Sequence, residues 1–372
     1  MNNADTLDAR LSADGLAWAQ RLVRFNTVSH ESNLGVIECI ADHLRTLGVV
    51  PRITWDDERR KANLFATLGE GRPDGLILSG HTDTVPWDGQ AWSMDPLSGE
   101  VRDGRLYARG SADMKGFIGL ATSQARDFLE ADLPFAVHLA FSYDEEVGCF
   151  GVRHLIADLK EAGLAPRLCI VGEPTGMIPA IAHKGVHRWR CCVRGKAAHS
   201  SQTTSAVNAI EAAARVVARV ADLADDLRNN EPRQEGFDVP FSTAAVCVVQ
   251  GGIADNVVPE DCRFHYEFRN LPGADEVAMQ RLVAEHAAAL EPAMKAVDPT
   301  SGFRFEQTAS IPAFQVDPGD PAVQLAQRLA GVDRTTLVAF GTEAGLFQKA
   351  GISTVVCGPG HIAQAHQADE YV

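Results

Sequence analysis

The chain has 372 residues, of which 45% are hydrophobic and 22% charged, and its formal net charge at pH 7 is −15. This length exceeds that of a typical single domain and allows a large core, so two domains are expected. The strong negative charge argues against nucleic acids and anionic membrane surfaces as partners.

The N-terminal segment, MNNADTLDARLSADG, lacks the basic region and the apolar region that make up a secretory signal. No uninterrupted apolar stretch approaches the roughly 18 residues that a membrane span requires. We therefore expect a soluble, cytoplasmic protein without a membrane partner.

Short apolar segments alternate with helical patterns in the first half of the chain and return near its end. The predicted buried strands are LILS (76–79), VHLAFSY (137–143), LCIVG (168–172), TTLVAF (335–340) and ISTVVCG (352–358). Between the first two, residues 112–129 have the pattern of a helix. Strands separated by helices predict an α/β fold with a mostly parallel central sheet and helices on both faces.

A different pattern occupies the middle of the chain. VHRWRCCVR (186–194) alternates, with arginines on one face and Trp189, Cys191 and Val193 on the other. The segment continues with a helix (205–228), strands (243–250 and 262–269), a helix (274–290) and a strand (303–310). This β-α-β-β-α-β order predicts a smaller α+β, ferredoxin-like domain. We place it at residues 184–310, inserted into a catalytic domain formed by residues 1–183 and 311–372.

Metal-ligating residue types follow the predicted strands of the first half. They are His81 and Asp83 after the first strand, Asp144, Glu145 and Glu146 after the second, and Glu173 after the third, with Asp113 at the start of the predicted helix. Sites in open α/β sheets form beyond the carboxyl ends of the strands, so these side chains are expected to converge. Carboxylates and imidazole suit zinc, cobalt or manganese, and the lack of thiolate ligands favours a catalytic site over a structural one.

Several of these residues also have a purely structural explanation. His81 could be an ordinary histidine near the core edge, Asp113 could interact with a helix dipole, and Glu173 could belong to a turn before proline. The adjacent Glu145 and Glu146 fit such explanations poorly, because neighbouring carboxylates after a buried strand repel one another and lose solvation. A cation would offset both costs, so we favour one metal centre.

Five segments resemble the motifs of the dizinc aminoacylase/carboxypeptidase family, in the order found there. They are GHTDTVP (80–86), GRLYARGSADMKG (104–116), DEEVG (144–148), GEPT (172–175) and QAHQADEYV (364–372). The family includes acetylornithine deacetylases, succinyl-diaminopimelate desuccinylases and glutamate carboxypeptidases. The resemblance extends from about residue 20 to the end of the chain.

This resemblance implies a centre of two divalent cations, zinc or alternatively cobalt. Asp113 would bridge the two cations. His81 and Glu173 would complete the ligands of one cation, and Glu146 and His366 those of the other.

The resemblance also implies three catalytic roles. Glu145 would act as the general base, taking a proton from the attacking water and delivering it to the departing amine. Asp83 would accept the second imidazole N–H of His81. His199, in GKAAHSS (195–201), would reach the active site of the partner subunit and donate to the developing oxyanion. A homodimer formed through the inserted domain is therefore expected.

Substrate contacts are implied for Asn256 and Arg269, which would hold the substrate's backbone and α-carboxylate, and for Gly341 and Thr342, which would line the pocket. Arg269 has the fork geometry that a carboxylate prefers, although an outward arginine on an alternating strand is also common. His199 could likewise be a polar residue at a helix entry.

The segments 237–243, 340–347 and 356–372 are most similar to those of acetylornithine deacetylases. The expected substrate is a small N-acyl amino acid, and the expected reaction converts N2-acetyl-L-ornithine to L-ornithine and acetate in arginine biosynthesis. A desuccinylase, a carboxypeptidase, a dipeptidase or a general N-acyl-amino-acid hydrolase stays open. A binding protein on the same scaffold would be expected to lack a ligand or Glu145, and all of them are present.

Overall fold

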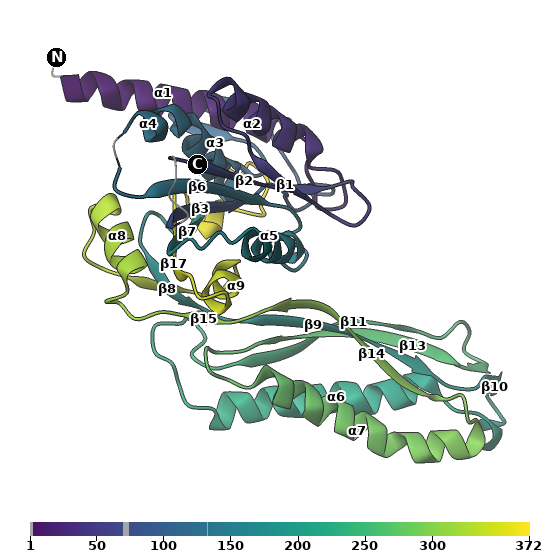
Figure 1. Cartoon of the computed structure of the whole chain (residues 1–372). Coiled ribbons are helices and arrows are strands. Elements are labelled where there is room, and N and C mark those ends of the chain that lie inside the picture. Colours follow the sequence, from purple (N-terminus) through teal and green to yellow (C-terminus); the bar gives the residue numbers. More distant parts are fainter. Residues whose placement is uncertain (1–2, 70–73, 132) are drawn as a thin grey trace. The chain divides into compact units, whose positions relative to one another are not determined.

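The computed structural model describes residues 3–69, 74–131 and 133–372, which fold into two compact units (Figure 1). Unit 1 comprises Met1–Ile181, Gln315–Leu337 and Thr342–Val372, and unit 2 comprises Ala182–Phe314 and Val338–Gly341. The chain passes from unit 1 to unit 2 within strand β8 (Ala180–His183) and returns to unit 1 within strand β15 (Phe314–Gln315).

The main sheet of unit 1 has parallel strands at its centre. Its order is β1-β2-β6-β3-β7-β17-β8-β15, with parallel pairing from β6 through β3 and β7 to β17 and antiparallel pairing of β1 with β2, β2 with β6, and β17 with β8. Its strands include β1 (Arg52–Trp55), β2 (Ala62–Leu68), β3 (Gly75–His81), β6 (Ala136–Ser142), β7 (Leu168–Pro174) and β17 (Ser353–Gly358). A small hairpin of β4 (Glu100–Arg102) and β5 (Arg105–Tyr107) lies outside this sheet.

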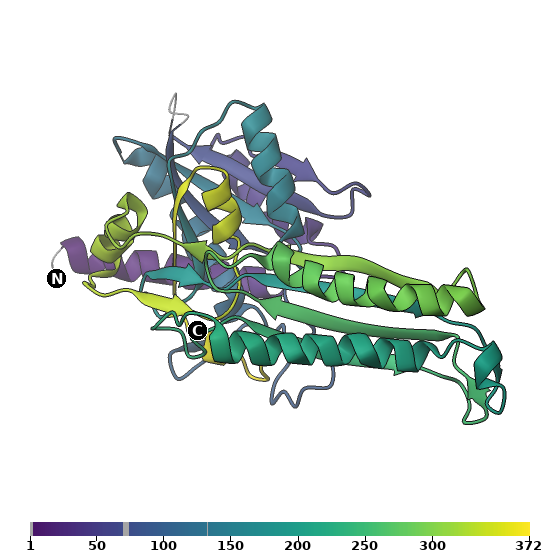
Figure 2. The ribbon, with the colours of Figure 1, turned by 90° about the horizontal axis from the view of Figure 1, so that it is seen from below.

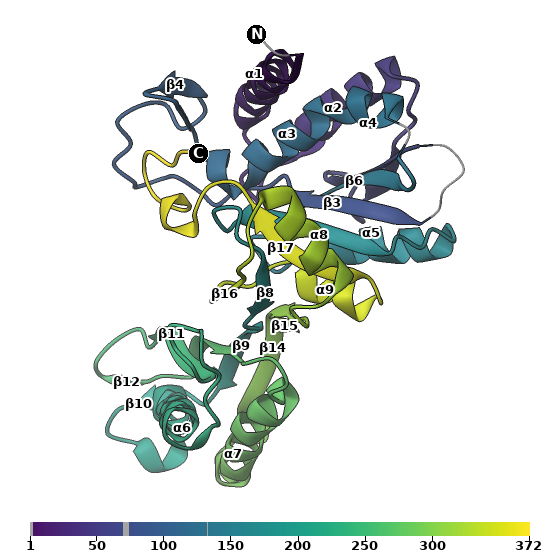
Figure 3. The same cartoon turned by 90° about the vertical axis from the view of Figure 1, so that its left-hand side faces the viewer.

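Helices cover both faces of this sheet, which confirms the predicted α/β class (Figure 3). One face carries α1 (Asn3–Val23), α2 (Leu34–Thr46), α3 (Gly116–Ser123) and α4 (Ala125–Glu130); the other carries α5 (Phe150–Glu161), α8 (Pro321–Ala330) and α9 (Ala344–Lys349). Because it is covered from both sides, every residue of β6 is buried. This double burial explains why the central strands are nearly continuous apolar runs.

The helix predicted over residues 112–129 is wrong as a single element. A turn of π-helix, Ser111–Lys115, comes first, and α3 and α4 follow. Asp113 (φ −125°, ψ 90°) and Met114 (φ −136°, ψ 33°) have non-helical dihedral angles, and Gly110 before them adopts φ 80°. Asp113 therefore lies in an extended bend ahead of the helix, which a periodic apolar pattern does not indicate.

Unit 2 has the predicted β-α-β-β-α-β order. Its sheet is antiparallel throughout, in the order β11-β13-β9-β14, and α6 and α7 lie side by side on one face (Figure 2). The elements are β9 (Val186–Arg194), α6 (Ala209–Asn230), β11 (Thr243–Gly251), β13 (Asp261–Arg269), α7 (Glu276–Val297) and β14 (Gly302–Ile311), with the short β10 (Ala198–His199), η2 (Thr203–Ser205) and β12 (Val257–Val258). The core includes Cys191, Val193 and Phe264 from the strands, packed with the apolar side of both helices.

The segment 335–340 differs from its prediction as a buried strand. Only Thr336–Val338 forms a strand, β16, and its residues are half-buried because it pairs with β8 beside the main path of the sheet. A short 3-10 helix, Ile362–Gln364, precedes the C-terminal segment. Within the described ranges, no helix has both the length and the apolar character needed to cross a membrane.

Candidate metal centre

The carboxyl ends of three neighbouring parallel strands deliver acidic and imidazole side chains to one place. In the β3–β6 pairing His81 lies opposite Ser142, so these two strands end level with each other, and β7 runs beside β3 to reach Glu173. The turn after β6 carries Glu145 and Glu146. Parallel pairing thus brings together residues that are far apart in the sequence, as expected for an open α/β sheet.

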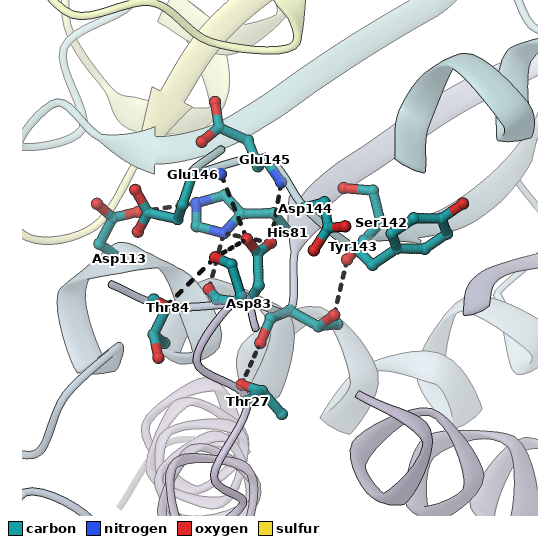
Figure 4. A network of polar contacts seen from close by, with 12 residues as sticks. Thr27, His81, Asp83, Thr84, Asp113, Ser142, Tyr143, Asp144, Glu145 and Glu146 are labelled. Atoms are coloured by element: carbon teal, nitrogen blue, oxygen red, sulfur yellow. Dashed lines mark hydrogen bonds and ion pairs between the residues drawn. The ribbon is translucent and has the colours of Figure 1, made fainter. Parts of the chain in front are cut away.

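Asp113 lies between the two histidines. Its Oδ1 is 2.9 Å from Nε2 of His81, and its Oδ2 is 3.2 Å from Nε2 of His366. His366 Nε2 is also 3.2 Å from Oε1 of Glu146, while His81 Nε2 is 3.7 Å from Oε1 of Glu173. The five residues predicted as ligands therefore lie together, and each oxygen of Asp113 faces a different imidazole. Figure 4 shows Asp113 and Glu146 beside the ring of His81.

Several carboxyl groups are buried together in this cluster, and a divalent cation would offset the cost of ionising them. Burial raises the pKa of Glu146 and, still more, the pKa of Glu173. Burial opposes ionisation of Asp113 as well, but hydrogen bonds with His366 and His81 hold its pKa below the ordinary value. Two triads, His81–Asp113–Glu146 and His81–Glu145–Glu173, can each offer ligand atoms within 4.8 Å of one another. Buried carboxylates beside imidazole nitrogens form the donor set of a catalytic zinc-type site, so the residues fit such a group.

Glu145 is also buried, and burial raises its pKa well above the ordinary range. The thiol of Cys149 donates a hydrogen bond to its Oε1, at 3.3 Å. A carboxylate with a raised pKa is suited to accepting a proton near neutral pH. Glu145 and Glu146 thus differ in their contacts: the second pairs with His366, and the first with a thiol.

The carboxylate of Asp83 holds the turn that carries both glutamates. Its Oδ1 accepts the backbone N–H of Glu145 at 3.1 Å, and its Oδ2 accepts that of Glu146 at 3.3 Å and the hydroxyl of Ser29 at 2.7 Å. Asp83 was predicted to accept the second imidazole N–H of His81 through its carboxylate, but its backbone carbonyl oxygen is the atom nearer to that nitrogen. The ring Nδ1 is 3.0 Å from the backbone carbonyl oxygen of Asp83 and 3.6 Å from its carboxylate.

Replacing Asp83 by alanine is expected to weaken metal binding or turnover by about 10- to 100-fold, the usual effect of losing a group that orients ligands. The reason is that two backbone N–H groups beside the glutamates would lose their acceptor. Metal titration and steady-state kinetics measure the effect. Asp298→Ala in unit 2 is the control, because Asp298 also accepts a backbone N–H, that of Thr300. Equal metal affinity and turnover in the two variants would contradict this role of Asp83.

Sequence reasoning missed several buried residues beside the centre, among them Glu343 and Cys149. Glu343 accepts hydrogen bonds from Ser142 and, at 3.2 Å, from Ser79, and burial raises its pKa to about 7. The buried thiol of Cys149 contacts Glu145, as described above. For Glu343 the available signal was a lone acid between apolar segments, in GTEAG; for Cys149 it was proximity to Glu145.

The neighbouring Thr342, predicted to line the substrate pocket, is fully buried. Its hydroxyl accepts the backbone N–H of Ala344 at 3.0 Å, at the start of α9. This contact is a local side-chain-to-backbone turn just before α9, within unit 1.

His199, Asn256, Arg269 and Gly341 belong to unit 2, where they form two groups. β10 and β12 pair His199 with Val257, and the N–H of Ser200 donates to the carbonyl oxygen of Asn256 at 2.9 Å, so His199 and Asn256 are neighbours. Both are exposed. The backbone N–H of Ser201 donates to Nδ1 of His199 at 3.3 Å, which leaves the proton of the neutral ring on Nε2.

Arg269 and Gly341 lie at the other end of the sheet. Arg269 ends β13, whereas the segment of His199 follows Arg194, which pairs with Asp261 at the start of β13. A strand rises about 3.3 Å per residue, so the two ends of β13 are about 26 Å apart. Gly341 packs near Val186, at the beginning of β9. The Arg269 guanidinium contacts Glu267 at 2.7 Å.

Comparison with known proteins finds a matching peptidase family and solved structures of similar fold. A family model described as peptidase family M20/M25/M40 matches residues 77–372. Three solved structures of similar fold are a tripeptidase from Staphylococcus aureus subsp. aureus Mu50 (TM-score 0.71, 19% identity, 97% of this chain and 93% of that chain), the M20 family metallo-carboxypeptidase Sso-CP2 from Sulfolobus solfataricus (0.75, 16%, 96% and 94%) and the Bacillus subtilis YXEP protein, a dinuclear metal binding peptidase of the M20 family (0.61, 15%, 96% and 89%).

Proposed function

Because the chain belongs to peptidase family M20/M25/M40, we propose that it hydrolyses the amide bond of N2-acetyl-L-ornithine, giving L-ornithine and acetate. The observation that carries the hydrolytic part of this proposal is the buried Asp113 carboxylate facing both His81 and His366, with the Glu145 carboxylate close to His81 and Glu173. The choice of substrate is supported by the similarity of segments 237–243, 340–347 and 356–372 to acetylornithine deacetylases. The reaction would serve arginine biosynthesis in the cytoplasm.

His81, Asp113 and Glu173 would hold one divalent cation, and Asp113, Glu146 and His366 the other, with zinc as the first choice and cobalt as the second. When bound, such cations lower the pKa of a water molecule and polarise the scissile carbonyl. Support for two cations comes from the facing of each Asp113 oxygen toward a different imidazole and from the dinuclear site named for the Bacillus subtilis protein.

Glu145 would take one proton from the attacking water and later deliver it to the departing amine nitrogen. The new carbon–oxygen bond would form first, and the carbon–nitrogen bond would break once the amine nitrogen has received the proton, so the products are a carboxylic acid and an amine without a covalent enzyme intermediate. The raised pKa of Glu145 supports its holding that proton between the two steps. Its hydrogen bond from the Cys149 thiol limits the positions that its carboxylate can take.

His199 and Asn256 would act on the active site of the partner subunit in a homodimer formed through unit 2. The separation of about 26 Å along β13 between their end of the sheet and Arg269 supports two different sites of action. The Nε2–H of His199 would donate to the developing oxyanion. Arg269 would hold the substrate's α-carboxylate, which requires release from Glu267.

A second candidate, a dipeptidase, tripeptidase or carboxypeptidase, is favoured by the names of the similar structures. A substrate panel separates the candidates: N2-acetyl-L-ornithine, N-succinyl-diaminopimelate, other N-acetyl amino acids, and di- and tripeptides, each tested with zinc and with cobalt. We expect the highest kcat/KM on N2-acetyl-L-ornithine, loss of all turnover with a chelator, and recovery when metal is returned.

Turnover of peptides without turnover of N2-acetyl-L-ornithine would replace the first candidate by the second. A metal-loaded protein that turns over none of these compounds would favour a binding protein. The mass of the same sample in solution tests the dimer, and a monomeric mass would contradict the role given to the partner's His199.

A further inference from the structure

The C-terminal segment holds the bridging aspartate through one buried carboxylate. Oε1 of Glu370 accepts the backbone N–H of Ala112 at 3.0 Å and that of Asp113 at 3.1 Å. Its Oε2 accepts a hydrogen bond from Nη1 of Arg109 at 2.7 Å, and both side chains of this ion pair are almost fully buried. A single oxygen atom therefore orients the two peptide groups that lead into Asp113.

The same segment carries His366. The carbonyl oxygen of His366 accepts a hydrogen bond from Nε2 of Gln90 at 2.9 Å, and the carbonyl oxygen of Gln367 accepts one from Arg109 Nη1 at 3.4 Å. Backbone hydrogen bonds between Leu106 and Val372 hold the end of the segment. Arg109 thus contacts both the segment of His366 and the carboxylate that holds Asp113.

The non-helical backbone of Asp113 explains why these contacts are needed. With φ −125° and ψ 90°, Asp113 lies outside the helix that follows, so helical hydrogen bonds do not fix its position. Its carboxylate nevertheless has to face His81 and His366 at once. Glu370 supplies an acceptor for the N–H groups on the N-terminal side of this bend, where a buried donor without a partner would be costly.

We propose that Glu370 is a positioning residue for the second cation, the one whose ligands are Asp113, Glu146 and His366. This inference rests on the proposed two-cation centre. Glu370 sets the spacing between Asp113 and His366, because it contacts the backbone of the first and belongs to the segment of the second. The first cation depends less on it, since His81 and Glu173 come from the ends of β3 and β7.

The test is a calorimetric titration of the metal-free protein with Zn²⁺ and with Co²⁺, together with the metal content and the Co²⁺ absorption spectrum. Glu370→Gln keeps an acceptor oxygen but places an NH₂ group beside Arg109 or the two backbone N–H groups. We expect its second cation to bind about 10- to 100-fold more weakly and its first to change by less than about threefold. Glu370→Asp should recover part of the loss.

Asp369→Asn is the matched control. Asp369 lies in the same segment and accepts the N–H of Ser93 at 2.9 Å, without any contact to Asp113. It should bind both cations as the wild type does. Leu44→Ala, at a buried core position of α2, controls for a general loss of stability.

Wild-type affinity for the second cation in Glu370→Gln would overturn the inference, as would an equal loss of both cations or the same loss in Leu44→Ala. If Glu370→Gln does not fold, the same comparisons apply to Glu370→Asp. A wild type that binds fewer than two cations overturns it too. These are binding measurements, so a wild type that binds two cations but hydrolyses none of the panel refutes the proposed substrate and leaves this inference standing.

Discussion

Glu145→Gln is expected to lower kcat by about 10²–10⁴-fold while the protein still binds its cations. This corresponds to about 3–5 kcal/mol of activation free energy. The amide keeps the size of the side chain and can accept the hydrogen bond from Cys149, but it cannot take a proton from water. Steady-state kinetics and the metal content of the same sample measure both parts of the expectation.

The adjacent Glu146 provides the comparison. Glu146 contacts His366 at 3.2 Å, so Glu146→Gln is expected to lose metal as well as turnover. Two neighbouring glutamates should therefore give different phenotypes, one catalytic with metal retained and one defective in metal binding. Retained turnover in Glu145→Gln, or an equal loss of metal in both variants, would show that the roles are assigned wrongly.

Asp113→Asn is expected to have the largest effect on metal binding. Its two carboxylate oxygens face different imidazoles, and whichever way the amide is turned, one of them is replaced by an NH₂ group that cannot act as a ligand. Losing a ligand should exceed the 10- to 100-fold effect of losing a supporting group, so at least one cation should bind more than about 100-fold more weakly. Turnover should fall with it.

Calorimetric titration and metal analysis measure this loss. Asp42→Asn, in α2, is the control, because Asp42 is exposed and its ion pair with Arg45 lies on the surface of the same helix. Normal binding of two cations by Asp113→Asn would refute the bridging role.

The regular parts of the fold could be predicted because burial leaves a pattern in the sequence. β6 and β7 are apolar runs, as strands covered on both faces must be, and β9 alternates because one of its faces is more exposed. The bend at Asp113 could not be predicted in this way. The residues around it satisfy a helical apolar pattern, whereas the bend depends on hydrogen bonds with Glu370, which is distant in the sequence.

The sequence indicated some residues of the candidate site and not others, again because only burial leaves a local pattern in the sequence. His81, Glu145 and Glu173 follow apolar strands, so residue type and strand ends together indicated them. His366 follows no such strand and was identified only through the resemblance of its motif. Glu343 and Glu370 act through hydrogen bonds to residues far along the chain, and neither local periodicity nor spacing contains that information.

The dispersal of the proposed ligands, from His81 at the end of β3 to His366 near the end of the chain, has a thermodynamic consequence. An unfolded chain does not hold these groups together, so a cation that needs several of them binds the native state almost exclusively. At a free metal concentration one hundred times its dissociation constant, each such site would add about 2.7 kcal/mol to the free energy of unfolding. The supply of metal would then affect the stability of the folded unit 1 as well as its activity.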